Sequence, residues 1–427
     1  MAMSFVLIET LEVAMKSAKS RLIVILLQMI FNSILPDHKS IDAYKNDLKS
    51  DGLIWKLLSG FTHWDAEYFL KIAHSGYHDE RHLVFLPYFP LMTRSFAGLI
   101  NLITFNYLNY QDVLLLSGVL INQIHFILTT VVIYLLTIQL FSDRKFASRC
   151  CHYFSYSPAS IFFSTFYSES IFCFLTFSSL LASLNGHIYL SSILIGLSTI
   201  TRSNGLISIG FVLYFQAKKI VNRFYKRKFN CKFALKEVMK TLICLVICLI
   251  PFCLYQFYAA ETFCHKSRLS WCNNLFRFSY WQIQNKYWQV SFMSYYEFKQ
   301  IPNFILASPI IIFILTNSLN YFTKNKSLVS SLGFFVPNKL HESSSITSNV
   351  LCFVYFVHVT ALTLFCLFFI HIQVTTRLIA SSSPVLYWAA ASLNPMKNNL
   401  ATKLLNLWFY SYFILGTFFY CNGYPWT

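Results

Sequence analysis

Four carboxylates stand close together in a chain that has few of them. Residues 63–80 read HWDAEYFLKIAHSGYHDE and contain Asp65, Glu67, Asp79 and Glu80, whereas only 12% of all residues are charged. A positioned carboxylate can take a proton from a hydroxyl group as that hydroxyl attacks an electrophile. Asp65 and Glu67 are therefore candidate general bases, and Asp79 and Glu80 are alternatives that would otherwise contact the substrate.

A phosphate leaving group would require a facing cation, because negative charge develops on it during the transfer. The basic candidates near these acids are His63, Arg81 and His82, together with Arg377 in TTRLIASSSPVLYW. An arginine at the end of an apolar helix can instead simply extend its head group to the membrane interface. Both interpretations of Arg377 stay open.

Three further polar residues interrupt apolar segments. Glu169 is an isolated acid in SPASIFFSTFYSESIF, and Arg202 and Asn204 lie within STITRSNGL. An ionisable residue inside a membrane segment is by default a hypothesis of function. The alternative is that Arg202 and Asn204 only lock helix packing, which we favour slightly for Asn204, while Arg202 is assigned to phosphate binding or to packing.

The composition is that of a membrane protein. Of 427 residues, 56% are hydrophobic and the mean hydropathy is +0.51. Apolar runs near the length that spans a bilayer as a helix, about 20 residues, alternate with short polar breaks. The net charge of +17 follows from basic residues between these runs. This pattern is typical of positive cytoplasmic loops and predicts no nucleic-acid partner.

The pattern predicts an all-α polytopic membrane protein with one multi-span domain, 1–427, and about 11 transmembrane helices. The expected spans are 19–36, 84–104, 113–141, 150–166, 169–186, 188–216, 240–258, 303–323, 349–371, 375–393 and 404–422.

The basic residues predict a cytoplasmic N-terminus and a basic cytoplasmic loop at 218–240. The segments 37–83 and 259–302 then become the first and second luminal loops. This count places the basic stretch 143–149 in the lumen, as an exception to the rule.

Helical spacing of apolar residues over 62–77 predicts an amphipathic helix in the membrane interface, with Trp64 at that depth and Asp65 in its first turn. A first-turn acid also complements the helix dipole without any chemistry. Pro87 and Pro90 are expected to break the start of the second span beside a cavity.

The cysteines show no spacing typical of a metal site, so no metal is expected. Cys264 and Cys272 lie in the second luminal loop, where they either form a disulfide or remain two free thiols.

Taken in chain order, these motifs resemble the phosphatidylinositol glycan class V family of mannosyltransferases. The resemblance runs from about residue 60 to the last residue, although the second luminal loop has no matching motif. It is carried by Trp64-Asp65, Ala66-Glu67, Phe69-Leu70, Ile72-Ala73, Gly76-Tyr77, Phe85–Leu91, Ser157–Ala159, Tyr167–Glu169, Arg202–Gly205, Arg377, Ser381–Trp388 and Pro425–Thr427.

The resemblance implies an inverting GT-C type glycosyltransferase in the endoplasmic reticulum membrane, with interfacial helices in its first luminal loop. It would transfer mannose from dolichyl-phosphate-mannose to the GPI precursor and add the second mannose in α1,6 linkage. It implies lipid substrates, no cofactor and Asp65 as the base. Fungal members work with a small membrane subunit, so the resemblance also implies such a partner here. No residue of this chain indicates whether the partner is needed.

Three alternatives remain at this stage. One is another dolichol-dependent mannosyltransferase, against which the RSNG and SSSPVLYW motifs argue. Another is a lipid transporter or scramblase, which would predict several deep charges or inverted repeats. The third is a non-catalytic subunit, which would tolerate loss of Asp65.

Overall fold

The computed structural model describes residues 2–38, 48–225, 230–265, 269–273, 277–334, 345–393 and 399–426, which form helices and loops without a strand. The α-helices are α1 (Ala2–Ile34), α2 (Leu53–Leu58), α3 (Asp65–Ser75), α4 (Tyr88–Ile103), α5 (Tyr110–Phe141), α6 (Arg144–Ser155), α7 (Glu169–Leu184), α8 (Ile188–Thr199), α9 (Ile209–Tyr225), α10 (Cys231–Cys264), α11 (Ser279–Trp288), α12 (Ile301–Lys324), α13 (Lys326–Ser330), α14 (Phe353–Phe369), α15 (Thr375–Ser382), α16 (Val385–Ser392) and α17 (Leu400–Cys421). Short 3-10 helices join them: η1 (Ser59–Phe61), η2 (Glu80–Val84), η3 (Ser160–Phe163), η4 (Ser203–Ser208), η5 (Ser270–Asn273), η6 (Phe298–Gln300), η7 (Val350–Cys352) and η8 (Ile372–Val374).

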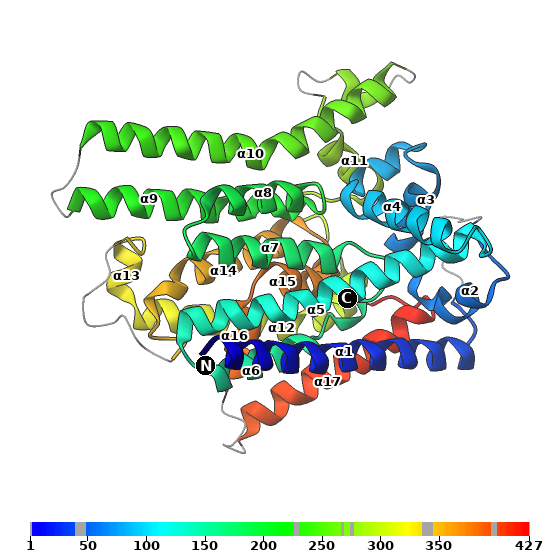
Figure 1. Cartoon of the computed structure of the whole chain (residues 1–427), viewed down its shortest axis with the longest axis horizontal. Helices are drawn as coiled ribbons and strands as arrows, with labels where there is room; N and C mark the ends of the chain where they lie inside the picture. Colours follow the sequence, from blue (N-terminus) through cyan, green and yellow to red (C-terminus); the bar gives the residue numbers. More distant parts are fainter. Residues whose placement is uncertain are drawn as a thin grey trace.

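The long helices run side by side, as Figure 1 shows for α1, α5, α7, α8 and α10. Within the described residues, five helical segments are long and apolar enough to cross a membrane, with mean hydropathy between 1.3 and 2.3. They are Tyr110–Phe141, Cys231–Cys264, Phe298–Lys324, Val350–Phe369 and Leu400–Cys421. The chain is therefore an all-α, multi-pass membrane protein, which confirms the predicted class.

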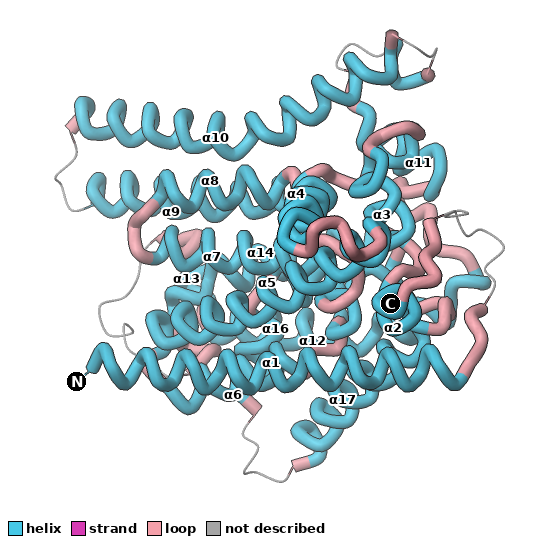
Figure 2. Tube along the Cα trace, turned by 45° about the vertical axis from the view of Figure 1, so that its right-hand side comes forward, coloured by secondary structure: helices cyan, strands magenta, loops and turns pink. Residues whose placement is uncertain are grey.

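The helix at the expected second span crosses the direction of the bundle. Figure 2 views α4 almost end-on, while α1, α8 and α10 run across the picture. Pro87 occupies the N-cap of α4, which begins at Tyr88 and has 16 residues. Such a helix is about 24 Å long, shorter than the roughly 30 Å of a hydrocarbon core. The segment 84–104 thus contains a helix, but one placed across the bundle.

This geometry corrects the placement of the basic stretch 143–149. Arg144 Nη1 lies 3.3 Å from Glu9 Oε1 near the start of α1, and the Tyr134 hydroxyl donates to Glu9 Oε2 at 2.7 Å. The stretch therefore lies at the same end as the N-terminus, and its expected location on the opposite side is wrong. The sequence prediction counted two crossings, α4 and α5, between the first span and this stretch. Because α4 lies across the bundle, α5 alone brings the chain back to the end where α1 begins.

Several expected spans are broken helices. The segment 188–216 divides into α8, η4 and α9 around Arg202, and 375–393 divides into α15 and α16 before Pro384. Gly205 permits the first break, since a Cβ there would lie 2.7 Å from the carbonyl carbon and Oγ of Ser198. The first break carries Arg202 of the candidate site, and Arg377 lies in α15, the helix before the second break.

A buried arginine supports the break between α6 and η3, within the expected span 150–166. Arg21 of α1 is only 2% exposed. Its guanidinium donates to the backbone carbonyls of Ser155 and Ser160, each at 3.0 Å. These carbonyls have lost their helical partners at the break, so Arg21 satisfies them and fixes the chain shortly before Tyr167 and Glu169.

The two ends of the bundle differ in charge and structure. Most of the expected basic loop 218–240 is helical, because its described residues complete α9 and begin α10. These helix ends lie with the N-terminus and α13 on the left of Figure 1, whereas α2, α3, α4 and α11 lie on the right. Helix α3 of the right-hand end carries Asp65, the first residue of the candidate site.

Candidate active site

Helix α3 begins at Asp65, in the amphipathic segment that sequence periodicity predicted. The preceding residue, Trp64, has a backbone φ of +60°, which residues other than glycine rarely adopt. Neighbours hold this turn from both sides: the Tyr420 hydroxyl donates to the His63 carbonyl at 2.7 Å, and the Asp65 amide donates to the Tyr167 hydroxyl at 3.0 Å. Such backbone strain persists where surrounding contacts impose it and is frequent at active sites.

Arg377 of α15 connects two acids from distant parts of the chain. Its Nη2 donates to Asp65 Oδ2 at 2.9 Å, and its Nη1 lies 3.5 Å from Glu169 Oε1. The guanidinium carbon lies 5.1 Å from the ring centre of Phe162 and 5.3 Å from that of Tyr167. With its side chain 14% exposed, Arg377 is held by charge and by aromatic faces, and does not extend to the membrane interface.

Glu169 extends the series to a second arginine. Its side chain has no exposed surface and begins α7, while Arg202 Nη1 lies 2.6 Å from its Oε1. Two carboxylates and two guanidinium groups therefore alternate as Asp65, Arg377, Glu169 and Arg202, which we call the ion-pair chain. Their charges balance, as burial requires.

Exposure separates the two acids of the ion-pair chain. The Asp65 side chain is 33% exposed, and its Oδ1 has no hydrogen-bond donor among the described residues. Asp65 can therefore meet a substrate, whereas the enclosed Glu169 contacts only protein. In chemical terms, this is a partly open carboxylate close to two cations that are mostly shielded from solvent, an arrangement able to accept a proton and to stabilise a nearby anion.

Asn204 lies beside the ion-pair chain but has its own partner. Its amide donates to the Ser382 hydroxyl of α15 at 2.8 Å. The hydroxyls of Ser203 and Tyr280 lie 2.7 Å apart, so α11 also contacts this break. Asn204 thus ties η4 to the helix that carries Arg377, in keeping with the structural role that the sequence favoured slightly.

The other acids of the first loop lie in a different set of contacts. Asp79 pairs with Arg81, whose Nη2 is 2.6 Å from Asp79 Oδ2. This hydrogen-bonded pairing holds the pKa of Asp79 below its ordinary value. Burial lowers the pKa of His82 to about 4, so His82 is uncharged near neutral pH and does not supply the expected cation.

Glu80 joins the first loop to the second. It accepts hydrogen bonds from Lys286 and Tyr287, and from Trp271 Nε1 at 3.3 Å. Burial acts to raise the pKa of Glu80, but these hydrogen bonds outweigh burial and lower it. We call Glu80, Trp271, Lys286 and Tyr287 the loop brace.

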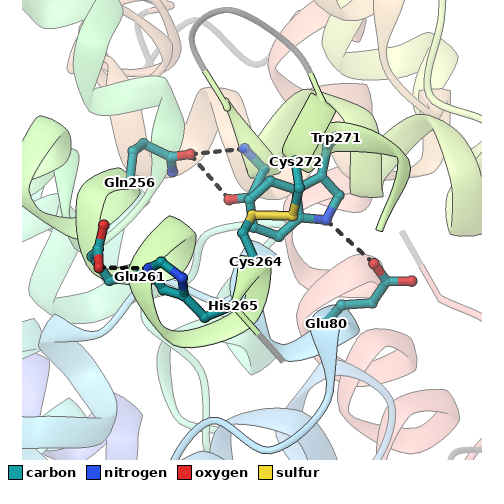
Figure 3. The surroundings of a disulfide bond; sticks show 8 residues. Glu80, Gln256, Glu261, Cys264, His265, Trp271 and Cys272 are labelled. Carbon is teal, nitrogen blue, oxygen red and sulfur yellow. Dashed lines mark hydrogen bonds and ion pairs between the residues drawn. A yellow bond between two sulfur atoms is a disulfide. The ribbon is translucent and has the colours of Figure 1, made fainter. Parts of the chain in front are cut away.

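Figure 3 shows Trp271 next to the disulfide between Cys264 and Cys272, one of the two states that the sequence left open.

Glu67 lies on another face of α3. It stands two positions after Asp65, which corresponds to about 200° around a helix. Its Oε2 is buried and has no hydrogen-bond partner in the described part of the chain. Burial raises the pKa of Glu67 to about 7, so the group is partly protonated near neutral pH.

Comparisons with known proteins agree with the motifs. A family model described as Mannosyltransferase (PIG-V) matches residues 11–427. The chain belongs to the PIG-V mannosyltransferase family. Accordingly, it is a glycosyltransferase, which supports the enzyme interpretation over a transporter or a non-catalytic subunit.

Relatives with similar sequences match this chain over nearly its whole length. GPI mannosyltransferase 2 of Drosophila pseudoobscura pseudoobscura is 31% identical over 96% of this chain and 98% of its own. GPI alpha-1,6-mannosyltransferase 2 of Cricetulus griseus is 31% identical over 97% and 98%. A solved oligosaccharyltransferase from Archaeoglobus fulgidus covers 95% of this chain and 53% of its own, with 11% identity and a TM-score of 0.43, too low to support an argument.

Sequence reasoning missed aromatic partners of the PIG-V site. Tyr167, Tyr280 and Tyr420 contact the ion-pair chain or its flanking turns. Tyr167 had a signal, since it stands two residues before Glu169, but tyrosines are too frequent in this chain for that spacing to stand out. Tyr280 lies in the loop without a matching motif.

No group of three or more His, Cys, Asp or Glu side chains is placed to hold a metal ion within the described ranges. A reaction without a dedicated metal site, and without a cofactor, stays a prediction.

Proposed function

We propose that this mannosyltransferase uses dolichyl-phosphate-mannose to add the second mannose, in α1,6 linkage, to a GPI-anchor precursor. The names of relatives matched over almost their full length support this acceptor and this linkage. The alternative is that the enzyme transfers mannose to another lipid-linked acceptor. The RSNG and SSSPVLYW motifs favour the GPI precursor over that alternative.

The observation that carries the proposal is the ion-pair chain. In the proposed reaction, the acceptor hydroxyl oxygen bonds to the anomeric carbon as the bond from that carbon to the phosphate oxygen breaks. The electron pair leaves with the dolichyl phosphate, the hydroxyl proton passes to Asp65, and attack opposite the leaving group inverts the anomeric centre. One base suffices, and no covalent intermediate forms.

The arginines have complementary roles in this proposal. Arg377, which already contacts Asp65, would turn toward the departing phosphate while remaining near Glu169. Arg202 would add a second positive charge there, and buried Glu169 would keep both guanidinium groups charged and oriented. Trp64, which is 38% exposed next to Asp65, would contact the mannose or the lipid phosphate.

The assignments of Glu67, Asp79, Glu80, Arg81 and Asn204 remain predictions. Glu67 is an alternative base, and Asn204 an alternative contact for phosphate. Asp79, Glu80 and Arg81 would act from the first loop, where Asp79 pairs with Arg81 and Glu80 pairs with Lys286.

We also propose that the chain lies in the endoplasmic reticulum membrane as a GT-C type enzyme, with a cytoplasmic N-terminus. Eleven crossings accommodate the helices if α4 lies at the luminal surface and η4 with α9 forms a crossing separate from α8. The crossings are then α1, α5, α6 with η3, α7, α8, η4 with α9, α10, α12, α14, α15 with α16, and α17.

This topology places Arg144, Lys145 and the basic ends of α9 and α10 on the cytoplasmic side, so the positive-inside rule has no exception there. It places the disulfide in the oxidising lumen. A glycosylation sequon inserted at residues 105–109 should be modified, whereas one inserted at residue 142 should not. Modification at residue 142 would contradict this topology.

Complementation tests the function. Cells that lack the second GPI mannosyltransferase would express the wild-type chain, Asp65→Asn or Asp51→Asn at matched abundance. Asp51 is an exposed acid of the same loop and serves as the control. Surface GPI-anchored protein and GPI intermediates would be measured.

We expect rescue by the wild type and by Asp51→Asn, and a one-mannose intermediate with Asp65→Asn. Full rescue by Asp65→Asn would exclude Asp65 as the base and direct attention to Glu67. Wild-type failure, even with the small membrane subunit of a fungal relative co-expressed, would contradict the proposed reaction.

A further inference from the structure

A cavity of about 430 Å³ lies between α1 and α6. Its walls include Val13, Lys16 and Lys19 from α1 and Arg149 and His152 from α6. The two helices lie beside each other along the lower edge of the bundle in Figures 1 and 2. The volume is sufficient for a small-molecule head group, and no part of the ion-pair chain lines it.

The charges around this cavity are unbalanced. Lys19 has no ion-pair or hydrogen-bond partner among the described residues. Within the part of the chain that the structure describes, Arg149 donates only its Nε, to the carbonyl of Ala391 at 3.3 Å. Its guanidinium lies 5.8 Å from the Phe146 ring centre. Lys16 shares an exposed ion pair with Glu12, 2.6 Å away.

Nearby acids have other partners, and no carboxylate of the described residues lines the cavity. Glu9 pairs with Arg144, and Asp143 accepts from the Phe146 amide at the start of α6. Two cations, Lys19 and Arg149, are thus left facing a space that an anion can enter.

The position of the cavity indicates the kind of anion. The apolar run of α1 begins at Leu22, one turn beyond Lys19, so these cations stand where a lipid phosphate would lie. The walls also include apolar surface from Val13 and Tyr156, suited to the carbons next to a phosphate ester. We infer that this cavity binds the phosphate head group of an anionic membrane phospholipid. Its assignment to the cytoplasmic leaflet rests on the proposed topology, whereas binding itself does not.

Lipid titration of the purified full-length protein tests the inference. Native mass spectrometry would measure binding of dioleoyl phosphatidylserine and dioleoyl phosphatidylcholine to the wild type, to Lys19→Gln/Arg149→Gln and to Lys145→Gln. Lys145 is an exposed cation of α6 outside the cavity, and its variant is the matched control. The readout needs no enzymatic activity, so its failure is distinguishable from failure of the proposed function.

We expect phosphatidylserine to bind the wild type more tightly than phosphatidylcholine. The double substitution should weaken phosphatidylserine binding about twenty-five-fold, since each cation near a membrane surface contributes about fivefold. The control should keep wild-type affinity. If the double variant does not fold, Lys19→Gln alone should give about a fivefold loss.

Equal affinity of wild type and double variant for phosphatidylserine, or equal affinity of the wild type for both lipids, would overturn the inference. Inorganic phosphate added at constant ionic strength distinguishes the sources of the anion. Displacement of phosphatidylserine by inorganic phosphate at a concentration no higher than that of the lipid would assign the cavity to a soluble phosphate and reject the lipid.

Discussion

The ion-pair chain and the loop brace both join an acid of the first loop region to cations far away in sequence, yet they differ in burial. Glu169 has no exposed surface and Arg377 is 14% exposed, whereas the Lys286 side chain of the loop brace is 49% exposed. The ion-pair chain alternates charges of opposite sign. The loop brace surrounds one carboxylate with a lysine and neutral donors.

This difference distinguishes a functional site, the ion-pair chain, from a structural contact between two loops, the loop brace. Removing charges from water costs more than an isolated buried pair usually returns, so a buried alternating series is weak as a stabilising device. An exposed lysine contact costs little and contributes little. The costly arrangement stands next to the accessible Asp65, which is where a charge-stabilising function needs it.

The largest expected effect comes from breaking the ion-pair chain in its interior. Glu169→Gln leaves Arg202 and Arg377 without their shared counter-charge, so we expect unfolding stability to fall by about 3–5 kcal/mol. Thermal unfolding in detergent, with Glu261→Gln on exposed α10 surface as control, measures it. A loss as small as that of the control would show that the two arginines do not depend on Glu169.

A smaller effect is expected from removing the disulfide next to the loop brace. Cys264→Ser with Cys272→Ser opens a link between residues only 8 apart in sequence, for which loop entropy predicts a loss of about 2–3 kcal/mol. Unfolding of the wild type with and without reductant gives the same comparison without mutation. If reductant lowers wild-type stability while the double variant does not respond, the disulfide is responsible; an unresponsive wild type would contradict the prediction.

Glu80→Gln tests the loop brace directly. The substitution keeps the shape but removes the charge that attracts Lys286, so we expect a loss of about 1–2 kcal/mol. Mannosyl transfer should fall less than for Asp65→Asn at equal protein abundance. A loss of transfer as complete as that of Asp65→Asn, in a folded protein, would place Glu80 in the reaction and remove the distinction between the two regions.

The smallest effect concerns Glu67, an acid that belongs to neither region. Its pKa, raised by burial to about 7, means that the folded state holds a proton that the unfolded state releases near pH 4.5. Stability from this group is therefore complete below about pH 4.5 and declines as the pH rises through about 7.

Glu67→Gln should remove that decline and be more stable than the wild type at pH 8 by about 1 kcal/mol, with solvent screening allowed for. Melting temperatures between pH 5 and pH 8 measure the difference. Parallel profiles for the two proteins would show that Glu67 is ionised in the folded state.

Local pattern accounts for the predictions that the structure confirms. Hydrophobic runs fix which segments become long helices, and the amphipathic spacing after Thr62 predicts α3. The break at Arg202 follows from a polar TRSNG segment within an apolar run. Pro87 indicated that the helix of the second expected span would begin late, at Tyr88. That this short helix lies across the bundle depends on its packing and could not be predicted from the sequence.

By itself, the sequence determined an all-helical membrane protein, its family motifs and Asp65 in the first turn of an amphipathic helix. Tertiary structure alone decided that Asp65 meets Arg377, 312 residues later, and that both connect to Glu169 and Arg202. It also decided that Glu80 serves the loop brace and that 143–149 lies with the N-terminus. The physical reason is range: periodicity and turn residues act over a few positions, whereas charge pairing depends on which helices pack together.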